Sequence, residues 1–425
     1  MQIHFNNKQI KNNLLKGQFG LEKENIRINQ KGALSKIKHP FNNPQIDRDF
    51  SESQIEFITN KHNSIQSMLK ELIDLQKQSA EKLLNLKSGE EYLWPFSNPP
   101  QIKNDEHIII ADYHGDLAEK TVYRQYLAKK YGKKKMLYSG IHFNFSFPEE
   151  LLKQLYKTEN DKNEKYMTFK NNIYLDLSKK VTYYTWLIVY LTAASPIYDE
   201  SLFNTKINKE YASFRCSKYG YWNFFNPILD YSSFEEYLNS IKNYINKGLI
   251  CSEAELYYPV RLKCPVKTNL YKLKNCEINH IELRMIDLNP LFEEGIGFND
   301  VKFLHFFLIY LFSLPPVNFG ESQQVAALEN EKMASELCEE NIFLDLDGER
   351  VNIVNAGLDF LSGMEDFYKN LGFMDVLEII SFQKEKFLNP KGRYAYQVKD
   401  LFGDDFMGKG VVLAREHALF SANNF

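Results

Sequence analysis

The chain has 425 residues, of which 44% are hydrophobic and 25% are charged. This composition is that of a globular protein with a large core, and it excludes a disordered chain. The formal charge of −3 at pH 7 provides no basic surface, so we expect no nucleic-acid partner.

The first 18 residues contain no apolar run of the length that a signal peptide needs. The longest apolar runs, 181–194 and 301–314, have 14 residues each, whereas a membrane span needs roughly 20. The five cysteines show no CxxC spacing and are absent from the first half of the chain, which is typical of a reducing compartment. We therefore expect a cytoplasmic protein without membrane association.

Five stretches are predicted to be strands, because apolar residues alternate in them with Glu, His, Asn and Arg. Side chains in a strand point to opposite faces with a period of two, so each stretch presents one polar row. The stretches are 19–26, 52–59, 140–147, 253–261 and 278–287. The rows are Glu22 and Glu24; Glu52, Gln54 and Glu56; His142, Asn144 and Ser146; Glu255, Tyr257 and Arg261; and His280, Glu282 and Arg284. We expect one sheet to collect all five rows on a single face.

Helices are predicted between and after these strands. An apolar stripe at three- and four-residue spacing begins near Asn63 or Ser64 and continues to Leu83. The runs 181–194 and 301–314 are read as buried helices that stop at prolines, and 323–340 and 365–386 as charged helices. The segment 403–410 has the spacing of a phosphate loop without its Ser or Thr, and we expect only a turn there.

These elements predict an α+β fold, in which a curved, mostly antiparallel sheet has helices packed on its outer face and an open basin on the other. Because the polar rows matter only if they are assembled, residues 1–317 are expected to form one catalytic domain. Residues 318–425 carry no further polar row. They are expected to form a helical C-terminal extension packed on the same domain.

The polar rows favour a metal site. For a single strand, a solvated face is the simpler interpretation, but crowded carboxylates repel one another by several kcal/mol unless cations neutralise them. Oxygen ligands without zinc spacing favour Mg²⁺, with Mn²⁺ possible. His280 is interpreted as a structural histidine, whereas Asn144 beside His142 favours a substrate-facing role for both.

Several ordered blocks of sequence carry a resemblance to a known family. They are 17–27, 49–59, Leu93-Trp94-Pro95, Tyr123-Arg124, 139–146, Ser213-Phe214-Arg215, Gly220-Tyr221, Glu255-Leu256-Tyr257 and 281–290. Together they resemble glutamate–cysteine ligase, the enzyme that makes γ-glutamylcysteine in the first step of glutathione synthesis. The similarity is dense from residue 17 to about residue 296.

The resemblance implies a half barrel similar to that of glutamine synthetase. It also implies that Glu22, Glu24, Asp49, Glu56 and Glu282 hold magnesium. It places His142 and Arg215 near the glutamate, and Arg284 near the transferring phosphoryl group, which makes the two arginines the catalytic candidates. Tyr123, Arg124, Tyr221 and Tyr257 would surround the cysteine. The implied substrates are L-glutamate, L-cysteine and ATP, and no obligate protein partner is implied.

Two other functions remain open at this point. The chain is either a carboxylate–amine ligase of the same fold with another amine acceptor, or a binding protein that has lost turnover. The sequence departs from the family at Lys23, where an arginine is common, in the block Phe96-Ser97-Asn98, and beyond Pro316. With 425 residues, we expect a stand-alone enzyme without the glutathione-forming domain that is fused in some relatives.

Overall fold

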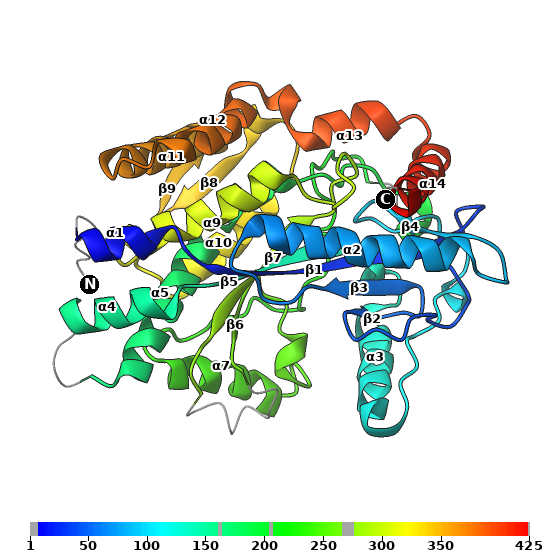
Figure 1. Ribbon diagram of the computed structural model, residues 1–425, viewed down its shortest axis with the longest axis horizontal. Coiled ribbons are helices and arrows are strands. Elements are labelled where there is room, and N and C mark those ends of the chain that lie inside the picture. Colours follow the sequence, from blue (N-terminus) through cyan, green and yellow to red (C-terminus); the bar gives the residue numbers. More distant parts are fainter. Residues whose placement is uncertain (1–6, 160–163, 204–206, 266–275, 424–425) are drawn as a thin grey trace.

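The computed structural model describes residues 7–159, 164–203, 207–265 and 276–423. Within these residues it contains a seven-stranded antiparallel sheet that runs through the centre of the molecule (Figure 1). The strand order is β2-β3-β1-β5-β7-β6, and β4 pairs with the far end of β1. The strands are β1 (Gln18–Asn29), β2 (Ile46–Arg48), β3 (Gln54–Ile58), β4 (Glu91–Trp94), β5 (Gly140–Ser146), β6 (Val260–Lys263) and β7 (His280–Asp287). The predicted α+β class with a curved antiparallel sheet is confirmed.

The strand register aligns the polar rows across one face of the sheet. Glu24 pairs with Glu56, Glu22 with His142, and Asn144 with Glu282. Since alternate residues share a face, four of the five predicted rows lie together. The pairing of β5 with β7 is irregular between Ile141 and Phe143, and such a bulge re-aims the side chains beside it.

Helices cover the opposite, apolar face of the sheet. Phe19, Phe143 and Leu283 are fully or almost fully buried there, in one core with side chains of α9. Figure 1 shows α2 lying along β1 and β3, and its N-cap is Ser64, as predicted. The helices are α1 (Lys8–Leu14), α2 (Ile65–Leu84), α3 (Ala118–Tyr131), α4 (Glu149–Glu159), α5 (Tyr166–Tyr183), α6 (Thr185–Thr192), α7 (Phe234–Asn246), α9 (Phe298–Ser313), α10 (Glu321–Ala334), α11 (Ile353–Asn370), α12 (Met374–Leu388), α13 (Tyr394–Phe402) and α14 (Phe406–Asn423). None of the helices in the described ranges is long and apolar enough to cross a membrane.

Lys23 is a polar exception on the covered face. Its side chain is buried, and Nζ donates to Oε1 of Gln76 at 3.1 Å and to the carbonyl of Glu293 at 3.0 Å. Burial lowers the pKa of Lys23 to about 8, against the opposing effect of Glu294 and Glu293. The lysine therefore ties α2 and the loop before α9 to the reverse side of the strand that carries Glu22 and Glu24.

The predicted strand at 253–261 is wrong in its first part. Residues Glu253–Glu255 form a 3₁₀ turn, and the strand begins only at Val260. Pro259 has no N–H to donate to a ladder, which limits the strand on that side. Glu255 is fully buried away from the polar row, where Oε1 accepts from Tyr131 Oη at 2.7 Å and pairs with Lys130.

Three helix predictions also need correction. The run 181–194 is divided between α5 and α6, which meet at Tyr184. The predicted helix 323–340 ends at Ala334, and the predicted helix 365–386 is two helices joined across Gly372, whose φ is +73°. The helix predicted at 301–314 is present as α9.

The prediction of a helical C-terminal extension is only partly correct. Strands β8 (Phe343–Leu346) and β9 (Glu349–Asn352) form a hairpin there, and α10 packs on α6 and β8. Residues 406–410, expected to be a turn, begin α14. A side chain at Gly410 would overlap the ring of Trp94, so this glycine lets α14 lie directly against β4.

A buried ionic network joins the C-terminal helices to α9. Asp300 accepts from Lys386 Nζ at 2.8 Å, from Gln383 Nε2 at 3.0 Å and from Tyr394 Oη at 2.7 Å. Asp300 is 2% exposed and Lys386 4%. Because both charges are buried, water cannot take the place of either partner. The contacts of Asp300 therefore hold α12 and α13 against α9.

We expect Asp300→Asn to lower the free energy of unfolding by about 3–5 kcal/mol, because it leaves the Lys386 ammonium buried without a counter-charge. Chemical denaturation with a two-state fit measures this loss. The double variant Asp300→Asn/Lys386→Met, which removes both charges, should recover much of the stability. A loss in the double variant as large as in the single variant would contradict the ionic explanation.

Candidate active site

The polar face of the sheet forms the wall of a cavity of about 290 Å³. Most of the predicted site residues line it: Glu22, Glu24, Asp49, Glu56, Tyr123, Arg124, His142, Arg215, Tyr221, Tyr257 and Arg284. These residues come from strands β1, β3, β5 and β7, from helix α3 and from loops. The structure thus brings together side chains that are up to 262 positions apart, from Glu22 to Arg284.

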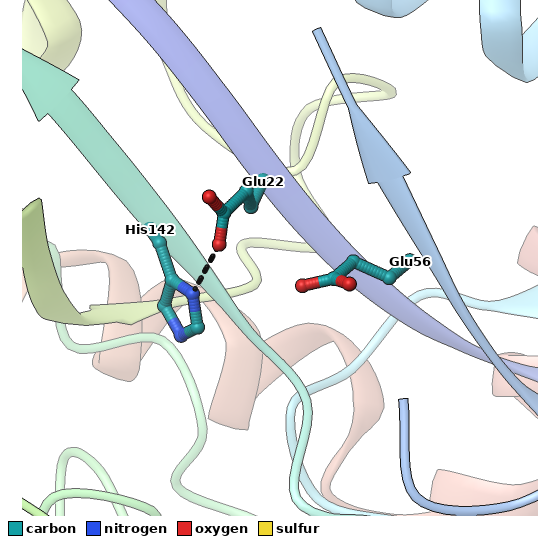
Figure 2. Close-up of side chains that lie close together, drawn as sticks. All are labelled: Glu22, Glu56 and His142. Atoms are coloured by element: carbon teal, nitrogen blue, oxygen red, sulfur yellow. Dashed lines mark hydrogen bonds and ion pairs between the residues drawn. The ribbon is translucent and has the colours of Figure 1, made fainter. Parts of the chain in front are cut away.

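Glu22, Glu56 and His142 point toward one another from three neighbouring strands (Figure 2). His142 Nδ1 lies 3.1 Å from Glu22 Oε2, and His142 Nε2 lies 3.8 Å from Glu24 Oε1. Glu22, Glu56 and His142 each offer one ligand atom, and these atoms lie within 4.8 Å of one another. Three such atoms at this spacing can contact one divalent cation.

Within the described part of the chain, no lysine or arginine forms an ion pair with Glu22, Glu24 or Glu56. Burial and then the nearby Asp49 raise the pKa of Glu24 to about 8. Burial and then the charge of Glu22 raise the pKa of Glu56 well above its usual value. For Glu22, burial opposes ionisation, but the hydrogen bond from His142 and the charges of His142 and Lys263 together lower the pKa. Among the described residues, no hydrogen bond or ion pair reaches the Glu56 carboxylate. A divalent cation fits this donor set, because it would supply the missing positive charge.

Glu282 has a different environment from the other predicted metal ligands. It is fully buried, outside the residues that line the cavity, and pairs with Arg284 Nη1 at 2.5 Å and with Lys263. Burial opposes ionisation, but Arg284 and then Lys263 hold the pKa of Glu282 well below its usual range. Its role as a metal ligand remains a prediction.

Arg215 is held by a main-chain carbonyl beside the carboxylate cluster. Nη2 donates to the carbonyl of Arg284 at 2.7 Å, and Nη1 lies 3.9 Å from Oδ1 of the buried Asp287. A Cβ at Gly140 would overlap the Arg215 guanidinium. The glycine that begins β5 therefore leaves the space in which the guanidinium lies.

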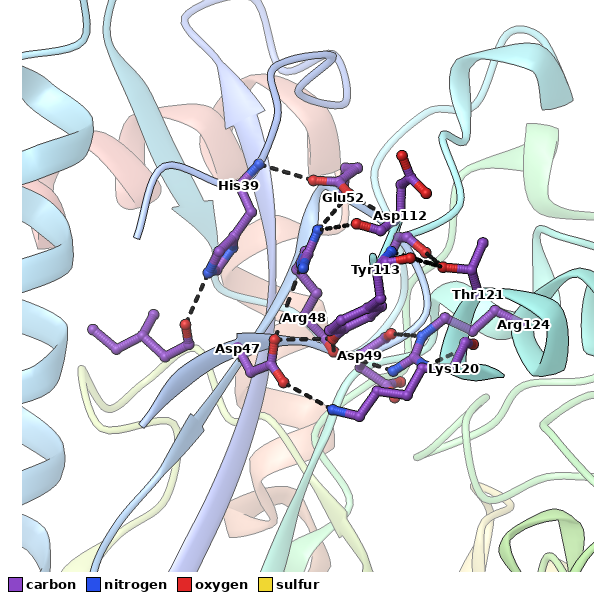
Figure 3. Close-up of polar contacts among 12 residues, drawn as sticks. His39, Asp47, Arg48, Asp49, Glu52, Asp112, Tyr113, Lys120, Thr121 and Arg124 are labelled. Atoms are coloured by element: carbon purple, nitrogen blue, oxygen red, sulfur yellow. Dashed lines mark hydrogen bonds and ion pairs between the residues drawn. The ribbon is translucent and has the colours of Figure 1, made fainter. Parts of the chain in front are cut away.

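An aromatic and basic wall closes another side of the cavity. The rings of Tyr221 and Tyr257 lie 3.7 Å apart between centroids, and their hydroxyl groups are hydrogen-bonded. Tyr123 and Arg124 come from α3. Arg124 donates to the carbonyls of Asp49 and Arg48 (Figure 3), so α3 is attached to the segment that carries Asp49.

Glu52 and Glu255, which belong to the predicted rows, are bound by other protein groups outside the cavity lining. Glu52 accepts from Arg48 Nη1 at 2.7 Å and from the main-chain N–H groups of His39 and Asp112, both at 2.8 Å (Figure 3). It organises the turn before β3, which begins only at Gln54. Glu255 is bound to Tyr131 and Lys130, as described above.

Several cavity residues escaped the sequence analysis. Lys263 lies two positions beyond Arg261 on β6, so the two side chains share a face. The predicted strand ended at Arg261, and extending it to Lys263 would have included both residues in the site. Glu331 comes from α10. In a charged helix a glutamate is normally solvated, and no sequence signal distinguished this one.

A second, larger groove of about 950 Å³ continues from the first cavity. Glu22 lines both. The predicted residue Asn144 lines this groove, and its Nδ2 donates to Glu22 Oε1 at 3.3 Å. His280 and Lys61 lie along the same groove.

The model of the family described as glutamate–cysteine ligase matches residues 3–249 and 231–334 of the chain. The chain belongs to this family. The bifunctional glutathione biosynthesis protein GshAB of Listeria monocytogenes is 40% identical over 406 residues, covering 91% of this chain and 52% of the relative. The GshAB protein of Enterococcus faecalis is 35% identical over 395 residues, covering 90% of this chain and 50% of the relative. The chain thus spans about half the length of these curated relatives.

Solved structures of the family share the fold. The bifunctional glutathione synthetase from Pasteurella multocida superimposes with a TM-score of 0.86 at 27% identity, covering 99% of this chain and 54% of that one. The glutamate–cysteine ligase from Francisella tularensis, in complex with AMP, superimposes with a TM-score of 0.85 at 22% identity. That likeness covers 96% of this chain and 89% of the other.

The pKa of Glu24 predicts a pH dependence of cation binding. Its folded-state pKa of about 8 exceeds the usual 4.5, so in the absence of cations its contribution to stability falls as the pH rises from about 4.5 to about 8. A bound divalent cation favours the ionised carboxylates, whereas protons compete with it at lower pH. We expect Mg²⁺ or Mn²⁺ to raise the unfolding temperature more at about pH 8 than at about pH 6.

Glu56→Gln should remove most of this stabilisation, whereas Glu81→Gln, an exposed change on α2, should leave it intact. Thermal unfolding with and without a chelator measures both effects. Equal stabilisation by the cation in the wild type and in Glu56→Gln would show that the cation does not bind at this cluster.

Proposed function

We propose that the chain joins the γ-carboxylate of L-glutamate to the amine of L-cysteine at the expense of ATP, and so performs the first step of glutathione synthesis. The observation that carries this proposal is the convergence of carboxylates, two arginines and a tyrosine wall on one cavity. Membership of the glutamate–cysteine ligase family supports it.

The reaction needs two steps, because a free carboxylate does not react with an amine. In the first, an oxygen of the γ-carboxylate attacks the γ-phosphorus of ATP, a new O–P bond forms, and ADP leaves. In the second, the cysteine amine attacks the carbonyl carbon of the acyl phosphate, inorganic phosphate leaves, and the amine loses a proton. Catalysis of such steps is mainly positioning and neutralisation of charge on the phosphoryl oxygens.

The two arginines suit these tasks. Arg284 lies at the bulge beside His142, where its planar guanidinium can bind phosphoryl oxygens bidentately. Arg215 Nη2 donates to the main-chain carbonyl of Arg284, so the Arg215 guanidinium is anchored to the strand that carries Arg284. We propose that Arg215 binds the glutamate and that His142 and Asn144 lie beside it.

We propose that Glu22, Glu24, Asp49 and Glu56 hold Mg²⁺, with Mn²⁺ as a substitute, and that Glu282 completes the set when its partners rearrange. A cation there would supply positive charge to the polyphosphate of ATP. The raised pKa values of Glu24 and Glu56 support the assignment, since among the described residues no lysine or arginine forms an ion pair with either group.

The nucleotide and the amine are proposed to occupy opposite ends of the site. The larger groove beyond Glu22 has a volume of about 950 Å³ and a polar lining that suit a nucleotide, which would place the phosphates near Glu22, the residue that lines both cavities. Tyr123, Arg124, Tyr221 and Tyr257 line the other end. We propose that they bind the cysteine.

The organisation of the chain is part of the proposal. We propose one catalytic domain, residues 1–317, with residues 318–425 packed on it, because α10 contributes Glu331 to the cavity and α14 contacts β4. We also propose that this ligase reaction proceeds without the second activity named in the bifunctional relatives.

The choice of amine is tested by phosphate release from Mg-ATP and L-glutamate with L-cysteine, L-serine, L-2-aminobutyrate and ammonia. We expect L-cysteine to give the highest kcat/KM, and the product to be γ-glutamylcysteine by mass spectrometry. Indifference to cysteine together with stimulation by another amine would establish a different ligase. Absence of phosphate release with every amine would indicate a binding protein without turnover.

Glu22→Gln should reduce kcat by about a hundredfold or more, the size expected when one preorganised electrostatic contact to the transition state is lost. Its unfolding temperature should change little, because the substitution weakens the contact with His142 but also relieves repulsion from the neighbouring carboxylates. Steady-state phosphate release and thermal unfolding give the two values. Activity near that of the wild type would reject the proposed role of the carboxylate row.

A further inference from the structure

One buried carboxyl group on the cavity wall has no role in the scheme above. Glu331 lies on α10, is 2% exposed, and lines the cavity. Its Oε2 is buried and has no hydrogen-bond partner, and among the described residues no ion pair reaches this side chain. A buried carboxyl without a partner is costly, and each such group in a native protein needs an explanation.

The surroundings of Glu331 are unfavourable to its charge until a positive group arrives. Burial raises its pKa to about 8, although Lys332 and Arg215 act in the opposite direction. The neighbouring Lys332 is paired with Glu329 at 2.7 Å on the solvent side of α10. Neither cation forms an ion pair with Glu331, so a ligand ammonium entering the cavity would be the missing partner.

Arg215 lines the same cavity and provides the complementary charge. Its guanidinium donates to the main-chain carbonyl of Arg284 and lies against Gly140, where a side chain would overlap it. A guanidinium beside a buried carboxyl matches the head group of an α-amino acid, which carries a carboxylate and an ammonium on one carbon.

Both amino-acid substrates have such a head group, but the chemistry distinguishes them. The acceptor must present its α-amine as a free nucleophile, so an ionic contact that keeps this amine protonated would oppose the reaction. The donor reacts through its γ-carboxylate, and its α-ammonium is free for recognition throughout.

We infer that Glu331 binds the α-ammonium group of the donor amino acid while Arg215 binds its α-carboxylate. The inference rests on the proposed function and names a substrate-binding residue in the C-terminal part of the chain. It makes the site selective for an amino acid over a simple dicarboxylate, because a ligand without the ammonium leaves the buried carboxyl unpaired.

The test uses Glu331→Gln and two fragments of the donor as competitive inhibitors. Glutarate retains the α-carboxylate and lacks the ammonium, whereas 4-aminobutyrate retains the ammonium and lacks the α-carboxylate. In the variant, we expect the KM of glutamate and the Ki of 4-aminobutyrate to rise about tenfold, since one charge-assisted contact is lost. The Ki of glutarate should change less than about twofold, and kcat less than about threefold.

Glu329→Gln is the matched control, because it makes the same change on the same helix at an exposed side chain paired with Lys332. It should leave all four constants unchanged. Glu331→Asp keeps the charge on a shorter side chain and should give intermediate values, which preserves the test if the glutamine variant folds poorly. Circular dichroism and thermal unfolding establish that each variant is folded.

Two outcomes would overturn the inference. An unchanged KM for glutamate would show that Glu331 does not contact the donor. A glutarate Ki that rises in step with the glutamate KM would show that Glu331 acts only by holding Arg215. If the wild type fails to release phosphate with glutamate and cysteine, the proposed function fails, and calorimetric binding of glutamate and glutarate to both proteins still decides the role of Glu331.

Discussion

The mutual repulsion of buried carboxylates is the constraint on which this site depends. The antiparallel register places Glu24 beside Glu56 and Glu22 beside His142, and the strands cannot separate without exposing the apolar residues on their other face. Packing on one side of the sheet therefore maintains an unfavourable arrangement of charge on the other. Strain of this kind is maintained only where the surrounding structure determines it fully.

The two ends of the polar face handle negative charge differently. At the β7 end, Lys263 and Arg284 neutralise Glu282 within the protein. At the β3 end, no such partner of Glu56 is present among the described residues, and burial, followed by the charge of Glu22, raises its pKa. A bound cation would therefore stabilise negative charge most at the β3 end, where the described part of the protein supplies no ion pair to Glu56. Arg215 and Arg124 are anchored in the same way. Each donates to a main-chain carbonyl of a segment that carries another site residue.

The alternation of residues was enough to predict the sheet, because strands with one buried face follow a strict period of two. The prediction failed where the backbone departs from that period. Pro259 delays β6, and the turn before β3 directs Glu52 to Arg48 and away from the cavity. The hairpin β8–β9 turns at Asp347-Gly348, both at positive φ. This dipeptide is a strong hairpin signal and could have been recognised.

Glu331 illustrates what a single sequence does not contain. Its place in the cavity depends on how α10 packs against α6 and on the loop that carries Arg215, and neither contact has a local signature. The assignment of roles to the tyrosines came only from the family resemblance. Periodicity showed which side of a strand is polar, but not what that side binds.

Lys23 and Glu24 are adjacent on β1 and point to opposite faces of the sheet. Each has a pKa of about 8, although one is a base and the other an acid. As the pH rises through about 8 without bound cations, Glu24 therefore gains a negative charge on the cavity face of the strand. Lys23 loses a positive charge on the covered face over the same pH range. The net charge of this pair of residues therefore changes by two units over this pH range. A residue with a permanent charge in place of Lys23 would reduce the change to one unit.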